Sequence, residues 1–300
     1  MAEHAHLSEV DPEIVPHLES LRTMPLIGVD VPLEEVRGYV GGPGLEMMKS
    51  KYESHLPPSS TYTVTSHSID LGGGVKRSAK NITPTPQDGE DDKFPALFTP
   101  DTKGFIMGNA DTDDYRLRIA SVKCRLSIVI FEYRLAPENP FPTAVNDSFA
   151  GLKHLASHPG KFCSSLEKGF LVGGTSAGGN LAAVLSHLAR DDPFFGDTPL
   201  TGQLLHIPIV LHHQAAPEEY QPLLLSFDQN KEFGRAQIIN FIESYNPDPT
   251  DTRFSPLLLD SHNGLPPAYL QVCGLDPLRD EGLLYEQVLR EAGVPTKLDM

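Results

Sequence analysis

The stretch 169-GFLVGGTSAGGNLAAVLSHLAR-190 decides the fold of this chain. Its first six residues form a short apolar run that is typical of a buried strand, and residues 177–190 have the periodicity of a helix. One tight turn joins the two segments, with Ser176 at its centre and Gly174 and Gly178 on either side. We expect glycine at both positions because the turn is strained and larger side chains would collide with neighbouring elements. The sequence therefore predicts a strand, a sharp turn that presents Ser176, and a helix.

Similar runs and helical patterns alternate along the rest of the chain. Besides 169–174, the apolar runs are 95–99, 126–133, 204–211 and 268–274, and the helical patterns are 110–123, 142–157, 177–190 and 279–292. Runs without polar alternation fit strands that are covered on both faces, and their alternation with helices predicts a parallel sheet. Two further strands, 61–70 and 74–83, precede them around a glycine-rich turn.

Two regions outside this alternation predict a lid. Residues 1–60 contain short helical patterns, which we interpret as N-terminal cap helices. The interval 213–255 is longer than a simple connection between two strands, and its apolar positions indicate a helical insertion. We therefore expect one α/β domain over 61–300 that carries this insertion over one end of its sheet.

Charge and composition exclude several kinds of partner. The formal net charge of −16 repels phosphate backbones and anionic lipid headgroups, so nucleic acid and membrane surfaces are not expected partners. The three cysteines lack metal-ligand spacing and lie in or near apolar runs, which predicts buried free thiols and no metal site. No motif indicates an organic cofactor. No secretory pattern and no run of membrane-spanning length are present, which indicates a cytoplasmic protein.

The serine turn also has a chemical meaning. Gly-x-Ser-x-Gly between a strand and a helix is the pattern of a nucleophilic serine. The N-terminus of the following helix points backbone N–H groups at negative charge that develops beside Ser176. We therefore take Ser176 as a candidate nucleophile and the N–H of Ala177 as a candidate donor to an oxyanion.

Three motifs in one order resemble a known family. Residues 133–142 (YRLAPENPFP), 173–180 (GGTSAGGN) and 274–280 (GLDPLRD) are similar to segments of the hormone-sensitive-lipase-like esterase branch of the α/β-hydrolases. The resemblance implies the α/β-hydrolase fold, a mostly parallel twisted sheet with helices on both faces and a helical cap. Arg134 is expected to pair with Glu138 or Asp147 and to have a structural role.

The resemblance gives Asp276 a catalytic role but leaves it without a partner. Asp276 follows the run 268–274 and so lies at the sheet edge that presents Ser176, where a carboxylate can orient a histidine. In this family the histidine comes later, in a loop after the next strand, but residues 277–300 contain none. We expect the chain to stop inside that strand, so that the C-terminal strand and helix are missing. Alternatively, the protein as written lacks the base.

Two earlier histidines are candidates for the rim of the site. His212 and His213 follow the apolar run 204–211, at the end of a predicted strand of the same sheet. Either one could replace the missing base only if it reaches Ser176. Without a base, a serine hydroxyl is a poor nucleophile.

The loop after the run 95–99 departs from the family pattern. Members of this branch carry His-Gly-Gly-Gly before an aromatic residue, whereas this chain has Asp-Thr-Lys-Gly at 101–104. The resemblance implies that backbone N–H groups of Lys103 and Gly104 join that of Ala177 in an oxyanion hole. Residues other than glycine restrict the close approach of a substrate there. The Lys103 ammonium group either lies near a substrate oxygen or projects into solvent.

Three functions are compatible with this pattern. The first is a serine-type carboxylic ester hydrolase for a small or medium apolar ester, impaired in the chain as written. The second is a non-hydrolytic protein that binds a small molecule, as in the plant gibberellin receptors, which resemble the same branch and have lost the histidine. The third is a cyclase, isomerase or dehydratase of secondary metabolism, since a cation beside an altered oxyanion loop suits proton transfer. The resemblance also implies a homodimer through the outer strands.

Overall fold

A single mixed sheet forms the centre of the computed structural model, which describes residues 5–16, 31–100, 104–221, 224 and 234–300. Within these residues the sheet has eight strands in the order β1-β2-β4-β3-β5-β6-β7-β8. The pairs β1–β2 and β2–β4 are antiparallel and all others are parallel. The strands are β1 (Tyr62–Asp70), β2 (Lys76–Pro84), β3 (Ala96–Pro100), β4 (Ser127–Phe131), β5 (Phe170–Thr175), β6 (Gly202–His206), β7 (Ala268–Gln271) and β8 (Thr296–Asp299). The predicted mostly parallel sheet is confirmed.

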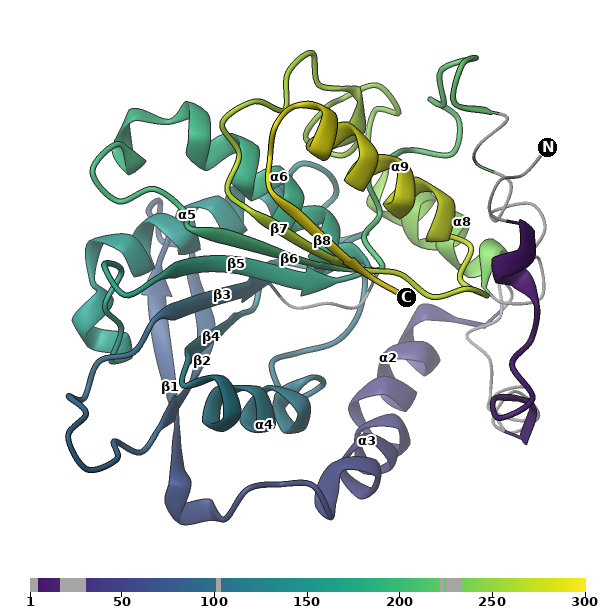
Figure 1. Cartoon of the computed structure of the whole chain (residues 1–300). Helices are drawn as coiled ribbons and strands as arrows, with labels where there is room; N and C mark the ends of the chain where they lie inside the picture. Colours follow the sequence, from purple (N-terminus) through teal and green to yellow (C-terminus); the bar gives the residue numbers. More distant parts are fainter. Residues whose placement is uncertain (1–4, 17–30, 101–103, 222–223, 225–233) are drawn as a thin grey trace.

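Helices cover both faces of the sheet, as the alternation predicted. Helix α4 lies on one face, below the strands in Figure 1, whereas α5, α6 and α9 lie on the other face. The α-helices are α2 (Leu33–Gly41), α3 (Pro43–Glu53), α4 (Asp114–Cys124), α5 (Thr143–Ser157), α6 (Ala177–Asp191), α8 (Arg235–Tyr245) and α9 (Arg279–Glu291). Short 3-10 helices are η1 (Ala5–Ser8), η2 (Ser59–Thr61), η3 (Pro159–Phe162), η4 (Pro193–Phe195) and η7 (Pro256–Leu258).

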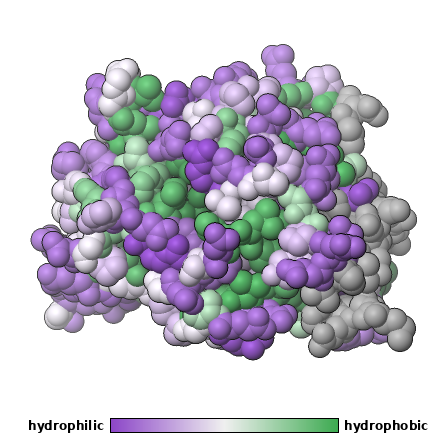
Figure 2. Space-filling view, turned by 90° about the horizontal axis from the view of Figure 1, so that it is seen from above, coloured by the Kyte–Doolittle hydropathy of each residue, from purple (hydrophilic) through white to green (hydrophobic). Residues whose placement is uncertain are grey.

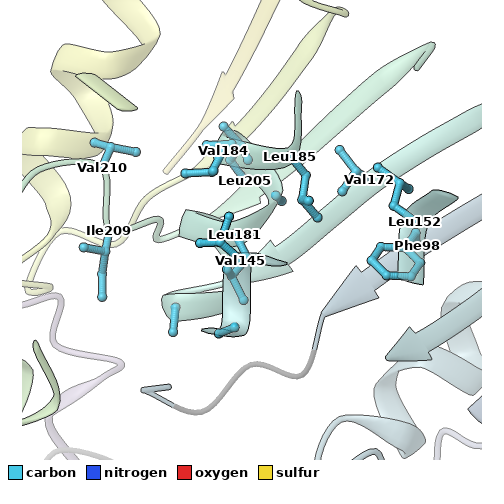
Figure 3. Packing of buried hydrophobic residues seen from close by; sticks show 14 of the residues in the cluster. Phe98, Val145, Leu152, Val172, Leu181, Val184, Leu185, Leu205, Ile209 and Val210 are labelled. Carbon is cyan, nitrogen blue, oxygen red and sulfur yellow. The ribbon is translucent and has the colours of Figure 1, made fainter. Parts of the chain in front are cut away.

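Alternating side chains of the strands divide the core between the two faces. In β3, Phe98 points to the side of α5 and α6, while Leu97 packs with Leu117 of α4. Figure 3 shows Phe98 and Val172 beside Leu152 of α5. Because both faces bury apolar residues, these strands read as continuous apolar runs in the sequence.

One strand prediction needs correction. The run 204–211 is not one strand: β6 ends at His206, and Ile207 has a positive φ of 40° that turns the chain out of the sheet. The residues after it are apolar because they are buried in a loop. Within the expected strand 294–300, Thr296–Asp299 pair in parallel with Ala268–Gln271 as β8.

Cap segments touch the loops that follow the parallel strands. The Arg37 side chain of α2 donates to the carbonyl oxygens of Ile106 and Ala136, at 2.7 and 2.9 Å, and forms a two-pronged ion pair with Glu138. Helix α8 is the described helix of the predicted insertion 213–255, of which residues 222–223 and 225–233 lie outside the described residues. The division into domains stays a prediction.

The outer surface of the helical layer is largely polar. Figure 2, which views the molecule from above Figure 1, shows hydrophilic side chains with smaller hydrophobic areas between them. Cys124 and Cys273 are exposed and Cys163 is half-buried, so the prediction of buried thiols is wrong. In the part of the chain that the structure describes, no helix is long and apolar enough to cross a membrane.

Candidate active site

The turn between β5 and α6 presents Ser176 in a strained conformation. Ser176 has φ of 55° and ψ of −113°, a region that residues with a side chain rarely adopt. Its N–H donates to the carbonyl oxygen of His206 in β6 at 2.9 Å, and its carbonyl oxygen accepts from Asn180 at 2.9 Å. The strand, sharp turn and helix predicted around Ser176 are confirmed, while its role as a nucleophile stays a prediction.

Close backbone contacts explain the glycines of this turn. A Cβ atom at Gly174 would lie 2.4 Å from the carbonyl carbon and oxygen of Gly178. A Cβ atom at Gly179 would lie 3.0 Å from the Cα atom of Pro208. Any side chain at position 174 would therefore push α6 away from β5 and displace Ser176.

Asn180 connects the turn to two loops. Its Nδ2 atom donates to the carbonyl oxygens of Ile209 and Phe254, at 2.8 and 2.6 Å, and the side chain is fully buried. The N–H of Ile209 in turn points to the carbonyl oxygen of Ser176 at 3.4 Å. Both backbone groups of Ile209, its N–H and its carbonyl oxygen, thereby join the loop after β6 to the serine turn.

The loop after β3 packs against α8. Gly104 and Phe105 have φ of 59° and 65°, and a Cβ atom at Gly104 would lie 2.7 Å from the ring of Phe241 in α8. The Phe105 ring stacks on Tyr245 of the same helix, with centroids 4.2 Å apart. Lys103, the other predicted oxyanion residue of this loop, lies outside the described residues. The positive φ and the nearby Phe241 ring of α8 both favour glycine at position 104.

Asp276 is half-buried in the loop between β7 and α9, and its carboxyl group accepts one hydrogen bond. Its Oδ1 atom accepts from the N–H of Leu278 at 2.7 Å. Burial, which disfavours the charged form, raises the pKa of Asp276 to about 6. Among the described residues no histidine contacts this carboxylate. The structure thus places Asp276 in the predicted loop, as a half-buried acid to which none of the described residues gives a cationic partner.

His212 and His213 pack with each other instead of with Asp276. Their rings stack with centroids 4.5 Å apart. The Nδ1 atom of His212 accepts from the N–H of Gln214 at 3.1 Å, and its ring meets Phe254 edge to face. Burial lowers the pKa of His212 to about 4, so the ring is neutral at pH 7. The described contacts give His212 a structural role in the loop after β6.

A second buried carboxyl group near the site was not recognised from the sequence. Glu281, in the first turn of α9, has its Oε1 atom 2.7 Å from the N–H of Val210. Acidic residues are common in the first turn of a helix because they interact with its dipole, so the sequence offered no distinguishing signal.

The segment 133–142 has the predicted structural role: the Arg134 guanidinium forms a two-pronged ion pair with Asp147, and Glu138 instead pairs with Arg37.

No group of three or more histidine, cysteine or acidic side chains within the described residues is arranged to hold a metal ion. Among the described residues, the site therefore consists of one strained serine, one half-buried aspartate and the backbone N–H groups around them. Such a set can bind and attack a carbonyl carbon, provided that a base accepts the serine proton.

Comparison with known proteins agrees with this geometry. The chain matches the family described as alpha/beta hydrolase fold over residues 103–300. Esterase LipI of Mycobacterium tuberculosis is 36% identical over 198 residues, which cover 65% of this chain and 59% of that protein, so the chain spans less than two thirds of its length. Among solved structures, vibralactone cyclase is 38% identical with a TM-score of 0.91, over 100% of this chain and 87% of that chain. An esterase from the archaeon Pyrobaculum calidifontis is 27% identical with a TM-score of 0.81, over 97% and 88%.

Proposed function

This chain belongs to the α/β-hydrolase fold family, and we propose that it is a carboxylic ester hydrolase that uses Ser176 as its nucleophile. The observation that carries the proposal is the strained Ser176 at the start of α6, at the same sheet edge as the half-buried Asp276. Two of the similar proteins are named esterases, which favours hydrolysis over a role in binding alone.

The reaction is an acyl transfer through Ser176. The Oγ atom attacks the carbonyl carbon of the ester, and the resulting oxyanion accepts hydrogen bonds from backbone N–H groups. We assign these donors to Ala177 and to the loop residues Lys103 and Gly104. The alcohol leaves with a proton, and water then releases the acid from Ser176.

The proton of Ser176 needs an acceptor. An imidazole between Ser176 and Asp276 would take it, and the Asp276 carboxylate would stabilise the imidazolium that forms. None of the described histidines contacts Asp276, and His212 is held by Gln214 and Phe254. We therefore expect slow ester cleavage by this chain and a strong response to added imidazole.

The substrate that we propose is a small or medium apolar ester. The surroundings of the loop that follows β3 are apolar: the rings of Phe105, Tyr245 and Phe254 pack with centroids 4.2 to 6.2 Å apart, and all three side chains are fully buried. Sites for small organic molecules are mostly apolar. A cytoplasmic location and a homodimer also belong to the proposal.

Labelling with a fluorophosphonate tests the nucleophile. The reagent phosphonylates activated serines, and intact mass spectrometry counts the added groups. With imidazole present as the base, we expect one adduct on the wild-type chain, located at Ser176 by peptide mapping, and none on Ser176→Ala. The variant Ser261→Ala, which removes an exposed serine, should label like the wild type. Equal labelling of Ser176→Ala and the wild type would refute the assignment.

The resemblance to vibralactone cyclase supports a second candidate on the same serine. If a hydroxyl group of the acyl chain attacks the acyl-Ser176 carbonyl before water does, the product is a ring instead of an acid. Product analysis separates the two: hydroxy esters would give lactones if the chain cyclises, and free hydroxy acids if it hydrolyses. Simple esters without a hydroxyl group would be cleaved only by the hydrolase.

A further inference from the structure

Glu281 is a buried acidic residue that the acyl transfer does not use. It lies in the first turn of α9, and 7% of its surface is exposed. The Oε1 atom accepts from two consecutive backbone N–H groups, those of Val210 at 2.7 Å and Leu211 at 3.3 Å. A single oxygen that holds two successive N–H groups fixes the position of the backbone that carries them.

The backbone that Glu281 holds also touches the serine turn. Immediately before Val210, Ile209 donates to the Ser176 carbonyl oxygen and accepts from Asn180. Pro208 lies between the glycines of two helices: it limits the space at Gly179 of α6 and is 3.7 Å from a Cβ atom placed on Gly282 of α9. Residues 208–211 therefore form a layer between the serine turn and α9.

Glu281 and Asp276 lie in one short, hydrogen-bonded segment, residues 276–281. The Asp276 carboxylate accepts a hydrogen bond from the N–H of Leu278. The backbone carbonyl oxygen of Asp276 accepts one from the N–H of Arg279 at 3.1 Å. Glu281 follows in the first turn of the helix that begins at Arg279. A change in the distance between this turn and residues 208–211 changes the distance between Asp276 and Ser176.

We propose that Glu281 is a positioning residue that fixes Asp276 relative to Ser176 by clamping the backbone of Val210 and Leu211 onto α9. The proposal rests on the acyl transfer at Ser176. Glu281 touches neither the serine nor the reacting atoms, and it acts through residues 208–211. A distance error near 1 Å between reacting groups can reduce a rate by about 100-fold.

The charge state of Glu281 suits this role. Burial, together with the nearby carboxylates of Asp276 and Asp280, raises the pKa of Glu281 to about 8, although the two backbone N–H groups oppose the shift. Asp280 is paired with the guanidinium group of Arg279, whose Nε lies 2.7 Å from Oδ1. At pH 7 Glu281 is thus a neutral acid, and Asp276 keeps the negative charge that an imidazolium partner needs.

Two substitutions at this position separate the clamp from general damage. Glu281→Gln keeps an acceptor oxygen and is neutral, so the clamp predicts kcat within about 3-fold of the wild type at pH 7. Glu281→Leu keeps the bulk but removes the acceptor, and we expect kcat to fall by about 10- to 100-fold with KM changed by less than about 3-fold. Glu291→Gln, at the exposed end of the same helix, is the matched control and should leave both constants unchanged.

Hydrogen exchange measures the clamp without any hydrolysis. The amides of Val210 and Leu211 should exchange at least about 10-fold faster in Glu281→Leu than in the wild type or in Glu281→Gln. If the wild-type chain cleaves no ester, the proposed function fails, but this comparison still decides the clamp. Unchanged exchange in Glu281→Leu, or equal loss of kcat in the Gln and Leu variants, would overturn the proposal.

Should Glu281→Leu fail to fold, the glutamine variant decides alone. The folded pKa of Glu281 is above its unfolded value, so the wild type loses stability as pH rises from about 4.5 to about 8. Glu281→Gln cannot ionise and should lack this part of the pH dependence while keeping kcat. A loss of kcat in this variant contradicts the clamp.

Discussion

The Ser176 turn and the Asp276 loop lie at the same edge of the sheet, but different interactions hold them. The serine turn is fixed by backbone contacts on all sides: Gly174 against Gly178, and Asn180 against two loop carbonyls. The half-buried Asp276 carboxyl group accepts one hydrogen bond from the N–H of Leu278, and its partial loss of solvent raises its pKa.

Many contacts thus fix the geometry of the turn, whereas no cationic group among the described residues pairs with the Asp276 carboxylate. Strain at Ser176 persists because the surrounding structure determines it many times over. A buried carboxylate without a cation costs stability unless it is protonated. Substitutions at the turn should therefore destabilise the protein, whereas neutralisation of Asp276 should stabilise it.

The largest effect is expected from Gly174→Ala. The new Cβ atom would lie 2.4 Å from the Gly178 backbone, so β5 and α6 must move apart. We expect a loss of about 3 kcal/mol or more in the free energy of unfolding, measured by urea denaturation, and loss of fluorophosphonate labelling at Ser176. Gly160→Ala is the control, because nothing lies within 4 Å of a Cβ atom there, and it should change stability by less than about 0.5 kcal/mol. Equal stability of the two variants would contradict the steric account.

Asn180→Ala should be the next most damaging change. It leaves the buried carbonyl oxygens of Ile209 and Phe254 without their donor. We expect a loss of about 2 kcal/mol in the free energy of unfolding. Asn146→Ala, on the exposed side of α5, provides the comparison and should cost less than about 0.5 kcal/mol. A similar small cost at both positions would show that Asn180 does not join the loops.

Asp276→Asn should act in the opposite direction. The folded pKa of Asp276, about 6, is above the unfolded value near 3.9, so the wild type loses stability as pH rises from about 4 to about 6. Above pH 6 the asparagine variant should be more stable than the wild type by about 1–2 kcal/mol. Thermal unfolding at pH 4.5 and pH 7.5 checks this, with the exposed Asp88→Asn as control. A gain that is equal at both pH values would mean that burial of the charge is not its cause.

The smallest effect concerns the joint between α6 and α9. The His187 side chain of α6 lies 3.1 Å from the hydroxyl group of Tyr285 in α9, and both are buried. Tyr285→Phe removes this hydrogen bond and should cost about 1 kcal/mol in the free energy of unfolding. Since this joint lies away from Ser176, kcat should hardly change. A large fall in kcat at unchanged stability would show that the two helices position the site here as well.

The sequence predicted what depends on local residues. The turn at Ser176 follows from glycines whose roles are steric, and the sheet follows from apolar runs that are buried on both faces. The place of Asp276 followed from a strand that ends just before it. All these features are encoded within about ten residues, so no knowledge of distant contacts was needed.

Features that depend on distant contacts were missed. The clamp joins Glu281 to Val210 across two elements, and nothing in either segment indicates the other. The residues after His206 are apolar because they are buried, although they do not form a strand. The sequence analysis therefore predicted a strand where the chain forms a buried loop. The choice of Asp147 over Glu138 by Arg134 depends on Arg37, which comes from the cap.

Rescue of ester cleavage by imidazole tests the central claim most directly. Wild type, Ser176→Ala and Asp276→Asn are assayed with p-nitrophenyl butyrate at pH 7.5, with and without imidazole, and the uncatalysed reaction of imidazole is subtracted. If Ser176 and Asp276 form an acyl-transfer site that lacks only its base, imidazole should raise the wild-type rate by about 10-fold or more. The gain should be absent in Ser176→Ala and much smaller in Asp276→Asn. The same gain in all three proteins would contradict the account.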